Sequence, residues 1–327
     1  MKILLSAALC FLLQEVQEGT TSTRPLLVPE AGTAESIKLL LEPYQAPQAE
    51  FSWKLRKRIQ KEHSIEYTLT FPSPISGTTK ENDTVWAHYW TPNPLKEKQP
   101  AVVALHWLGG SYEVLEVLCR RMAEEGICTL MVYMPHYGPR RAKDRSVRKK
   151  MISEDLECTT RSVRQAVLDV RRATDWLSAR PEVDGARVGI MGISLGAIIS
   201  SLTAGIDPRY FRCVFLLGGG DLPAIVLHPS SEMEDLRARL VEQGTTEEQL
   251  RETWKSIEPL TYASRIRAKD VLMINAAEDD IVPKACTLKL QEAIGVPSIE
   301  WVPGKHVDLI FQLGKVIPRL MEHFGRP

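Results

Sequence analysis

The stretch over residues 188–199 constrains the fold of this chain most strongly. It has the pattern of a short buried strand, a G-x-S-x-G turn with Ser194 at its centre, and the start of an apolar helix. Gly192 and Gly196 suit a sharp strand-to-helix turn, because side chains at these positions would collide with the neighbouring strand or helix. Such a turn holds the Ser194 hydroxyl at a sheet edge, over the positive end of a helix dipole. The alternative is a glycine-rich turn that only connects a strand to a helix.

Strand and helix patterns alternate around this turn. Apolar runs predict strands at 101–105, 128–134, 213–217, 271–275 and 298–302. Helical periodicity lies between and after them, at 112–125, 163–177, 284–293 and 307–323. This alternation predicts an α/β fold with a mostly parallel central sheet and helices on both faces.

The segment before this alternation has a different character. Residues 65–71 and 84–90 alternate like the two strands of a hairpin, and residues 51–61 have the pattern of a basic amphipathic helix. We therefore expect an N-terminal arm over residues 20–64 and one domain over residues 65–327.

One insertion interrupts the alternation, at about residues 222–262. It carries two amphipathic helical patterns, one centred on Leu236 and Leu240 and one that begins at Thr245-Thr246, where Glu248 and Gln249 are placed for a capping box. An insertion there is expected to lie over the carboxyl ends of the strands, where ligands bind in open α/β sheets. We interpret it as a small helical cap, with an inert surface excursion as the alternative.

The N-terminus has the pattern of an export signal. Met1 and Lys2 precede an apolar run over residues 3–13 and a polar stretch, so residues 1–19 are predicted to be a signal peptide. The protein is then exported, to the periplasm or the medium. The alternative is an N-terminal helix that packs on the domain of a cytoplasmic protein.

Composition excludes several classes of function. The 327 residues carry no net charge, which argues against a nucleic-acid-binding protein, and no internal apolar run is long enough for a membrane span. The six cysteines form no C-x-x-C pair and no cluster with zinc spacing. Neither a metal nor an organic cofactor is expected. The sequence does not indicate an oligomeric state.

A serine hydroxyl needs a base within hydrogen-bond reach, and that base needs an orienting carboxylate. Among the seven histidines, His306 follows the last predicted strand and precedes the last predicted helix, so it lies on the same sheet edge as Ser194. Asp279 follows another strand end, four residues before Pro283, in an acidic turn that is otherwise typical of solvated surface.

The chain order Ser194, Asp279, His306 resembles that of the α/β-hydrolase superfamily, and the resemblance covers roughly residues 65–325. The segment 277–283 is similar to the acid loop of that superfamily. Residues 106–111 resemble its His-Gly-x-x-Gly oxyanion loop, with Trp107 where glycine is common. The resemblance implies that the backbone N–H groups of Leu195 and Leu108 form the oxyanion hole, with Trp107 as the alternative to Leu108, and that His106 braces the loop.

These features predict a serine hydrolase that cleaves carboxylic esters of small-molecule substrates through Ser194, His306 and Asp279. Trp107 and Tyr137 are candidate substrate-binding residues, with packing beneath the cap as the alternative for Tyr137. A cap of two short helices predicts a small pocket and short acyl groups. Within the superfamily, the chain looks most like dienelactone hydrolases and acetyl xylan esterases. The alternatives are a prolyl-oligopeptidase-like peptidase and a non-catalytic binding protein on the same fold.

Overall fold

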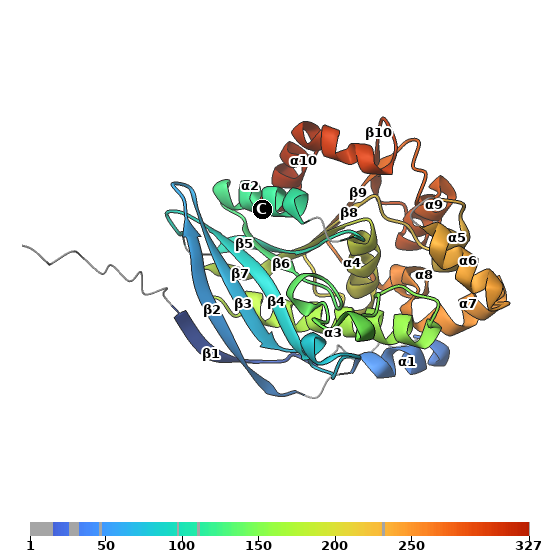
Figure 1. Cartoon of the computed structure of the whole chain (residues 1–327). Helices are drawn as coiled ribbons and strands as arrows, with labels where there is room; N and C mark the ends of the chain where they lie inside the picture. Colours follow the sequence, from blue (N-terminus) through green and yellow to red (C-terminus); the bar gives the residue numbers. More distant parts are fainter. Residues whose placement is uncertain are drawn as a thin grey trace, which may run out of the picture.

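The computed structural model describes residues 16–25, 33–45, 48–96, 98–109, 112–230 and 233–326. These residues form a ten-stranded sheet with the order β1-β2-β3-β4-β6-β5-β7-β8-β9-β10 (Figure 1). Pairs from β1–β2 to β4–β6 are antiparallel, and all pairs from β6–β5 to β9–β10 are parallel. The strands are β1 (Val16–Ser22), β2 (Glu50–Gln60), β3 (Ser64–Pro72), β4 (Thr84–Pro92), β5 (Gln99–Leu105), β6 (Cys128–Val132), β7 (Val183–Ile193), β8 (Arg212–Leu216), β9 (Asp270–Ala276) and β10 (Ser298–Val302).

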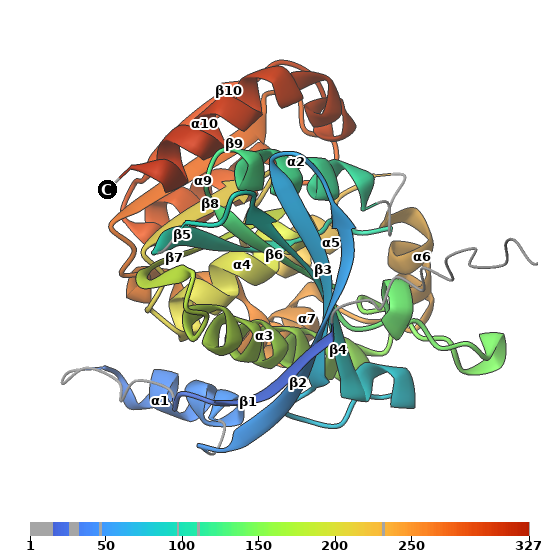
Figure 2. The same cartoon turned by 90° about the vertical axis from the view of Figure 1, so that its left-hand side faces the viewer.

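Helices cover both faces of this sheet, as predicted. Figure 2 shows α2 (Glu113–Glu124) and α10 (Leu313–Gly325) on one face, and α3 (Leu156–Ser178) and α4 (Leu195–Ile206) on the other. Strand β5 contributes alternate side chains to the two cores, which is why its sequence is apolar throughout. The remaining α-helices of the described residues are α1 (Glu35–Leu41), α5 (Leu222–Leu227), α6 (Glu234–Glu242), α7 (Glu247–Trp254), α8 (Pro259–Tyr262) and α9 (Lys284–Ile294).

The segment over residues 51–61 is strand β2, so its prediction as a helix was wrong. Phe51, Trp53 and Leu55 recur with period two, and Phe51 and Leu55 are buried. Lys54 and Arg56 alternate with them and lie towards the other face. β2 pairs with β1 on one side and with β3 on the other. The sheet therefore extends into the segment predicted as an arm. β1 begins at Val16, inside the predicted leader; residues 1–15 lie outside the described residues, and the signal peptide stays a prediction.

The insertion between β8 and β9 contains α5, α6, α7 and α8. Thr246 caps α7 through the predicted capping box with Gln249. The apolar faces of α6 and α7 are buried through Leu240, Leu250 and Trp254, which belong to the core shared with α3 and α4. The last predicted helix begins instead with a 3₁₀ segment, η8 (His306–Gln312), before α10 starts. Among the described residues, no helix is both long enough and apolar enough to cross a bilayer.

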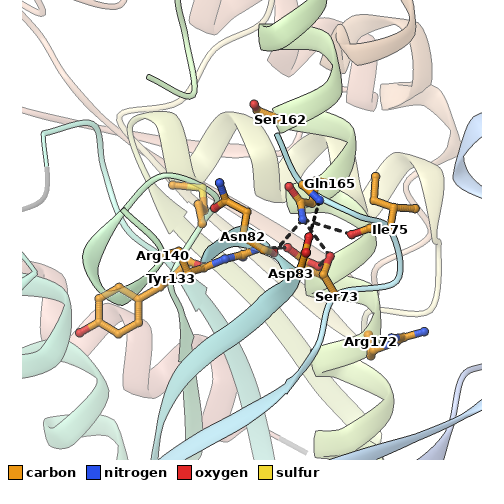
Figure 3. A network of polar contacts seen from close by, with 12 residues as sticks. Ser73, Ile75, Asn82, Asp83, Tyr133, Arg140, Ser162, Gln165 and Arg172 are labelled. Carbon is orange, nitrogen blue, oxygen red and sulfur yellow. Dashed lines mark hydrogen bonds and ion pairs between the residues drawn. The ribbon is translucent and has the colours of Figure 1, made fainter. Parts of the chain in front are cut away.

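A buried polar network fixes the loop after β6 against α3 (Figure 3). Arg140 is fully buried and donates to the carbonyl oxygens of Tyr133 and Asn82 at 2.9 and 2.8 Å, and it pairs with Asp169 at 2.7 Å. Gln165 donates to the Asn82 carbonyl at 2.9 Å as well. Buried polar groups are costly unless they are paired in this way, so the network specifies one position for this loop.

Arg140→Met is expected to lower the free energy of unfolding by about 3–5 kcal/mol, because it leaves a buried carboxyl group without its cation. Arg187→Met is the matched control: Arg187 pairs with Asp184 at the surface at 2.9 Å, and its loss should cost less than about 1 kcal/mol. Urea denaturation of both variants measures the difference. Equal losses would contradict a structural role for the buried pair.

Candidate active site

Ser194 lies in the turn between the end of β7 and the start of α4. Its backbone has φ 55° and ψ −117°, a strained conformation for a residue other than glycine. A Cβ atom at Gly192 would lie 2.1 Å from the backbone of Gly196, and one at Gly196 would lie 2.3 Å from the Leu105 carbonyl oxygen. The Ser194 N–H group donates to the Leu216 carbonyl at 2.8 Å. The two glycines therefore allow the contacts that hold the strained serine in place.

His306 begins η8, directly after the loop that follows β10. Its Nε2 atom lies 2.8 Å from the Ser194 Oγ atom, although 112 positions separate the two residues. Both side chains are buried. The loop is tied to the neighbouring acid loop by two backbone hydrogen bonds, from Ala277 to Val302 at 2.8 Å and from Glu278 to Gly304 at 3.1 Å.

Asp279 lies on the far side of the His306 ring. Its two carboxylate oxygens are 2.9 and 2.8 Å from His306 Nδ1. One of them also accepts the N–H groups of Ile281 and Val282 at 3.0 and 2.8 Å. With Nδ1 donating to Asp279, Nε2 is free to accept the Ser194 hydroxyl proton. Asp280, the neighbouring carboxylate, is half exposed and pairs with Lys305 at 3.3 Å instead.

The two segments predicted to form an oxyanion hole face one cavity. Leu195 follows Ser194 at the first position of α4, and Trp107 and Leu108 follow β5. All three line the cavity that contains Ser194 and His306. The assignment of Leu195 and Leu108 as donors to an oxyanion stays a prediction.

His106 braces the loop that carries Trp107 and Leu108. Its Nδ1 atom donates to the Trp107 carbonyl at 2.8 Å, and its Nε2 atom accepts the Met134 N–H at 3.1 Å. Burial lowers the pKa of His106 to about 4, so the ring is neutral at neutral pH and able to accept. It thereby joins the loop after β5 to the loop after β6.

The cavity over Ser194 has a volume of about 400 Å³ and is almost wholly apolar. Among the described residues that line it, polar side-chain atoms come only from Ser194, His306 and the Trp107 indole. Its walls come from several segments, and the apolar side chains beyond the predicted set are Ile152, Ile198, Leu217, Leu222, Ile225, Val226, Met233, Ile281, Val282, Val307 and Ile310. Sequence reasoning missed these residues. The sequence held one signal for these lining residues: Ile281 and Val282 are apolar although they lie within an acidic turn.

Tyr137 lies beside this cavity rather than in its wall. It is buried, its ring centroid is 4.7 Å from that of His106, and it lines an adjoining cavity of about 330 Å³. Arg141, Lys149 and Lys150 line the same adjoining cavity and are exposed. They belong to a run of basic residues in the loop over residues 140–152, which we call the basic loop. Arg140, the first residue of that basic run, is the exception because it is buried.

Candidate metal ligands do not cluster, and the cysteines are not exposed, in the part of the chain that the structure describes. No group of three or more His, Cys, Asp and Glu side chains among them is placed to hold a metal ion. The described cysteines are all free and buried, at Cys119, Cys128, Cys158, Cys213 and Cys286.

Comparison with known proteins agrees with this architecture. The family model described as the prolyl oligopeptidase family matches residues 158–309. An uncharacterised protein of Mycobacterium tuberculosis (strain H37Rv) is 26% identical over 187 residues, which are 56% of this chain and only 43% of that protein. The chain thus spans less than half the length of this curated relative.

Solved structures with a similar fold include several esterases. An acetyl xylan esterase from Paenibacillus sp. R4 has a TM-score of 0.64 at 18% identity, covering 90% of this chain and 96% of that one. Acetyl xylan esterase 1 from Thermoanaerobacterium sp. JW/SL YS485 has a TM-score of 0.64 at 17% identity, covering 91% and 96%. A dienelactone hydrolase homologue from Klebsiella pneumoniae has a TM-score of 0.54 at 17% identity, covering 80% and 99%. The sheet order and these likenesses show that the chain has the α/β-hydrolase fold, and the family match over residues 158–309 lies within it.

Proposed function

We propose that this protein is a serine hydrolase that cleaves carboxylic esters through an acyl-enzyme intermediate. The observation that carries the proposal is the continuous set of hydrogen bonds from Ser194 Oγ to His306 Nε2 and from His306 Nδ1 to Asp279, all at 2.8–2.9 Å. A nucleophile, a base and an orienting carboxylate in this order are the parts that acyl transfer requires.

The mechanism follows from these contacts. Ser194 Oγ attacks the ester carbonyl carbon while His306 Nε2 takes its proton, and the N–H groups of Leu195 and Leu108 bind the resulting oxyanion. His306 then gives the proton to the alcohol oxygen, which leaves. Water attacks the acyl-enzyme with His306 again as base, and the acid is released while Ser194 regains its proton.

The cavity supports an apolar acyl or alcohol group of limited size. Its volume of about 400 Å³ is near the lower end of the range for small-molecule sites. Apolar walls also exclude water, which strengthens the hydrogen bonds that stabilise the oxyanion. We infer a preference for short acyl esters.

A peptidase is the second candidate, and the prolyl oligopeptidase family match over residues 158–309 favours it. The chemistry at Ser194 is the same for an amide, so the two functions differ only in substrate. A screen that includes a proline-containing peptide p-nitroanilide beside p-nitrophenyl esters separates them, because an esterase of this kind should turn over only the esters at a substantial rate.

Ser194→Ala should abolish covalent labelling by a fluorophosphonate probe and lower ester turnover by several orders of magnitude. His306→Ala should do the same to turnover, and the double variant should be scarcely slower than either single one. Ser201→Ala is the matched control, because Ser201 lies on α4 and its hydroxyl donates only to the Ile198 carbonyl at 2.9 Å. Substantial ester hydrolysis by purified Ser194→Ala would refute the assignment, and an unlabelled wild-type protein would favour the non-catalytic alternative.

Asp279→Asn should lower kcat by about 10⁴-fold, because an amide does not hold His306 in the tautomer that accepts the serine proton. Asp280→Asn should change kcat by no more than a few-fold, since its carboxylate pairs with Lys305. Steady-state kinetics on one ester compare the two variants. A larger loss of kcat in Asp280→Asn than in Asp279→Asn would show that Asp280 is the acid that orients His306.

The acyl-length profile tests the cavity. On p-nitrophenyl esters from two to sixteen carbons, kcat/KM should climb with each added methylene, by at most about fourfold per step from burial, and then fall when the cavity is full. Ile225→Ala, which enlarges the cavity, should move the maximum to longer chains. Leu227→Ala on the same helix, outside the cavity lining, should not. A rise that continues to sixteen carbons would indicate a lipase-like groove instead.

A further inference from the structure

The 3₁₀ helix η8 presents three distinct rows of side chains beside Ser194. Residues three apart align in such a helix. His306 and Leu309 form a buried row. Val307 and Ile310 form a second row that lines the cavity, yet they are 56% and 39% exposed. Phe311 is next to this row and is 80% exposed.

We call Val307, Ile310 and Phe311 the η8 rim. An isolated apolar side chain on a surface is ordinary, but exposed apolar side chains that line a cavity indicate a binding surface. Val307 and Ile310 line the cavity, and Phe311 follows Ile310 directly in the chain. Among the other described large apolar side chains that are exposed, no two lie within five residues of each other in the sequence. These are Val16, Leu39, Ile59, Leu95, Val147, Val241, Leu288 and Val296.

The position of His306 decides which part of a substrate reaches the rim. His306 Nε2 must deliver its proton to the alcohol oxygen as that group leaves. Because His306 is the first residue of η8, the departing group is next to the row that begins at Val307. Ile310 continues that row, and both side chains line the same cavity as Ser194.

We propose that the substrate carries a large apolar alcohol, aryl or long alkyl, which lies against the η8 rim while its short acyl group occupies the inner cavity. This inference rests on the proposed esterase function. It names the substrate class as esters whose apolar surface is mainly on the alcohol side. Binding of such an alcohol removes Val307, Ile310 and Phe311 from water, which accounts for their exposure in the free protein.

The test varies the alcohol at constant acyl group. Butyrate esters of methanol, butanol, hexanol and benzyl alcohol are compared by titrating the released acid. Full burial of one methylene group raises kcat/KM by about fourfold. Because the rim covers only one side of the alcohol, each added methylene should raise kcat/KM by about twofold. The hexyl-to-methyl ratio should then exceed about tenfold.

Phe311→Ser and Ile310→Ser should each lower this ratio several-fold. Val241→Ser is the matched control: Val241 lies on α6, is 67% exposed and does not line the cavity, so its ratio should equal that of the wild type. Because Phe311 is the most exposed of the rim residues, its substitution also tests the proposal without disturbing packing.

Two kinds of result would overturn the inference: a rate that does not depend on the alcohol, and the absence of any ester hydrolysis. Hydrolysis at a rate independent of the alcohol would refute the rim as a substrate surface while leaving the esterase function intact. If the rate does not depend on the alcohol, two measurements reassign the rim. A dimer that sedimentation detects in the wild type but not in Phe311→Ser would assign the rim to a second copy of the chain. Binding of the wild type, but not of Phe311→Ser, to phosphatidylcholine vesicles would assign the rim to a lipid surface. Absence of hydrolysis of every ester, together with absence of fluorophosphonate labelling, would refute the function and this inference with it.

Discussion

The close approach of the Gly192–Gly196 turn to the end of β5 is the constraint on which the site depends. Gly196 packs against the carbonyl of Leu105 with no room for a side chain, so the start of α4 lies directly beside the loop that carries Trp107 and Leu108. This contact brings Ser194, the proposed nucleophile, and the predicted oxyanion donors into one cavity. A methyl group at either glycine would separate them, because both contacts are with backbone atoms that cannot rotate away.

A second, independent contact between two loops positions His306 and Asp279, the proposed base and its orienting acid. β9 and β10 are parallel neighbours, so the loops that follow them start at the same edge of the sheet. The hydrogen bonds from Ala277 and Glu278 to the β10 side fix the acid loop against the histidine loop. Asp279 therefore reaches His306 without any contribution from the cap, and substitutions in the cap should alter substrate choice more than they alter the chemical step.

The sequence was informative wherever a residue followed directly from a strand end. Ser194, Asp279 and His306 were all located in this way, because parallel strands bring their carboxyl ends to one edge whatever the rest of the chain does. β2 was mispredicted since its apolar residues at Trp53, Leu55 and Ile59 also fit a helical spacing, and only pairing with β1 and β3 decides between the two. The residues that line the cavity could not be predicted from the sequence, for a different reason. They come from the basic loop, α5, the acid loop and η8, and their association depends on tertiary packing that no local pattern encodes.

An apolar cavity suits this arrangement because each hydrogen bond or ion pair within it is stronger than it would be in water. The Asp279 carboxylate accepts three N–H groups, from His306, Ile281 and Val282, which compensate for the loss of its hydration. Both of its oxygens lie within 2.9 Å of His306 Nδ1, so the carboxylate faces the positive charge that His306 carries in the proposed mechanism. In water this interaction would be weak, but walls such as Ile281, Val282 and Leu217 keep water out and preserve its strength.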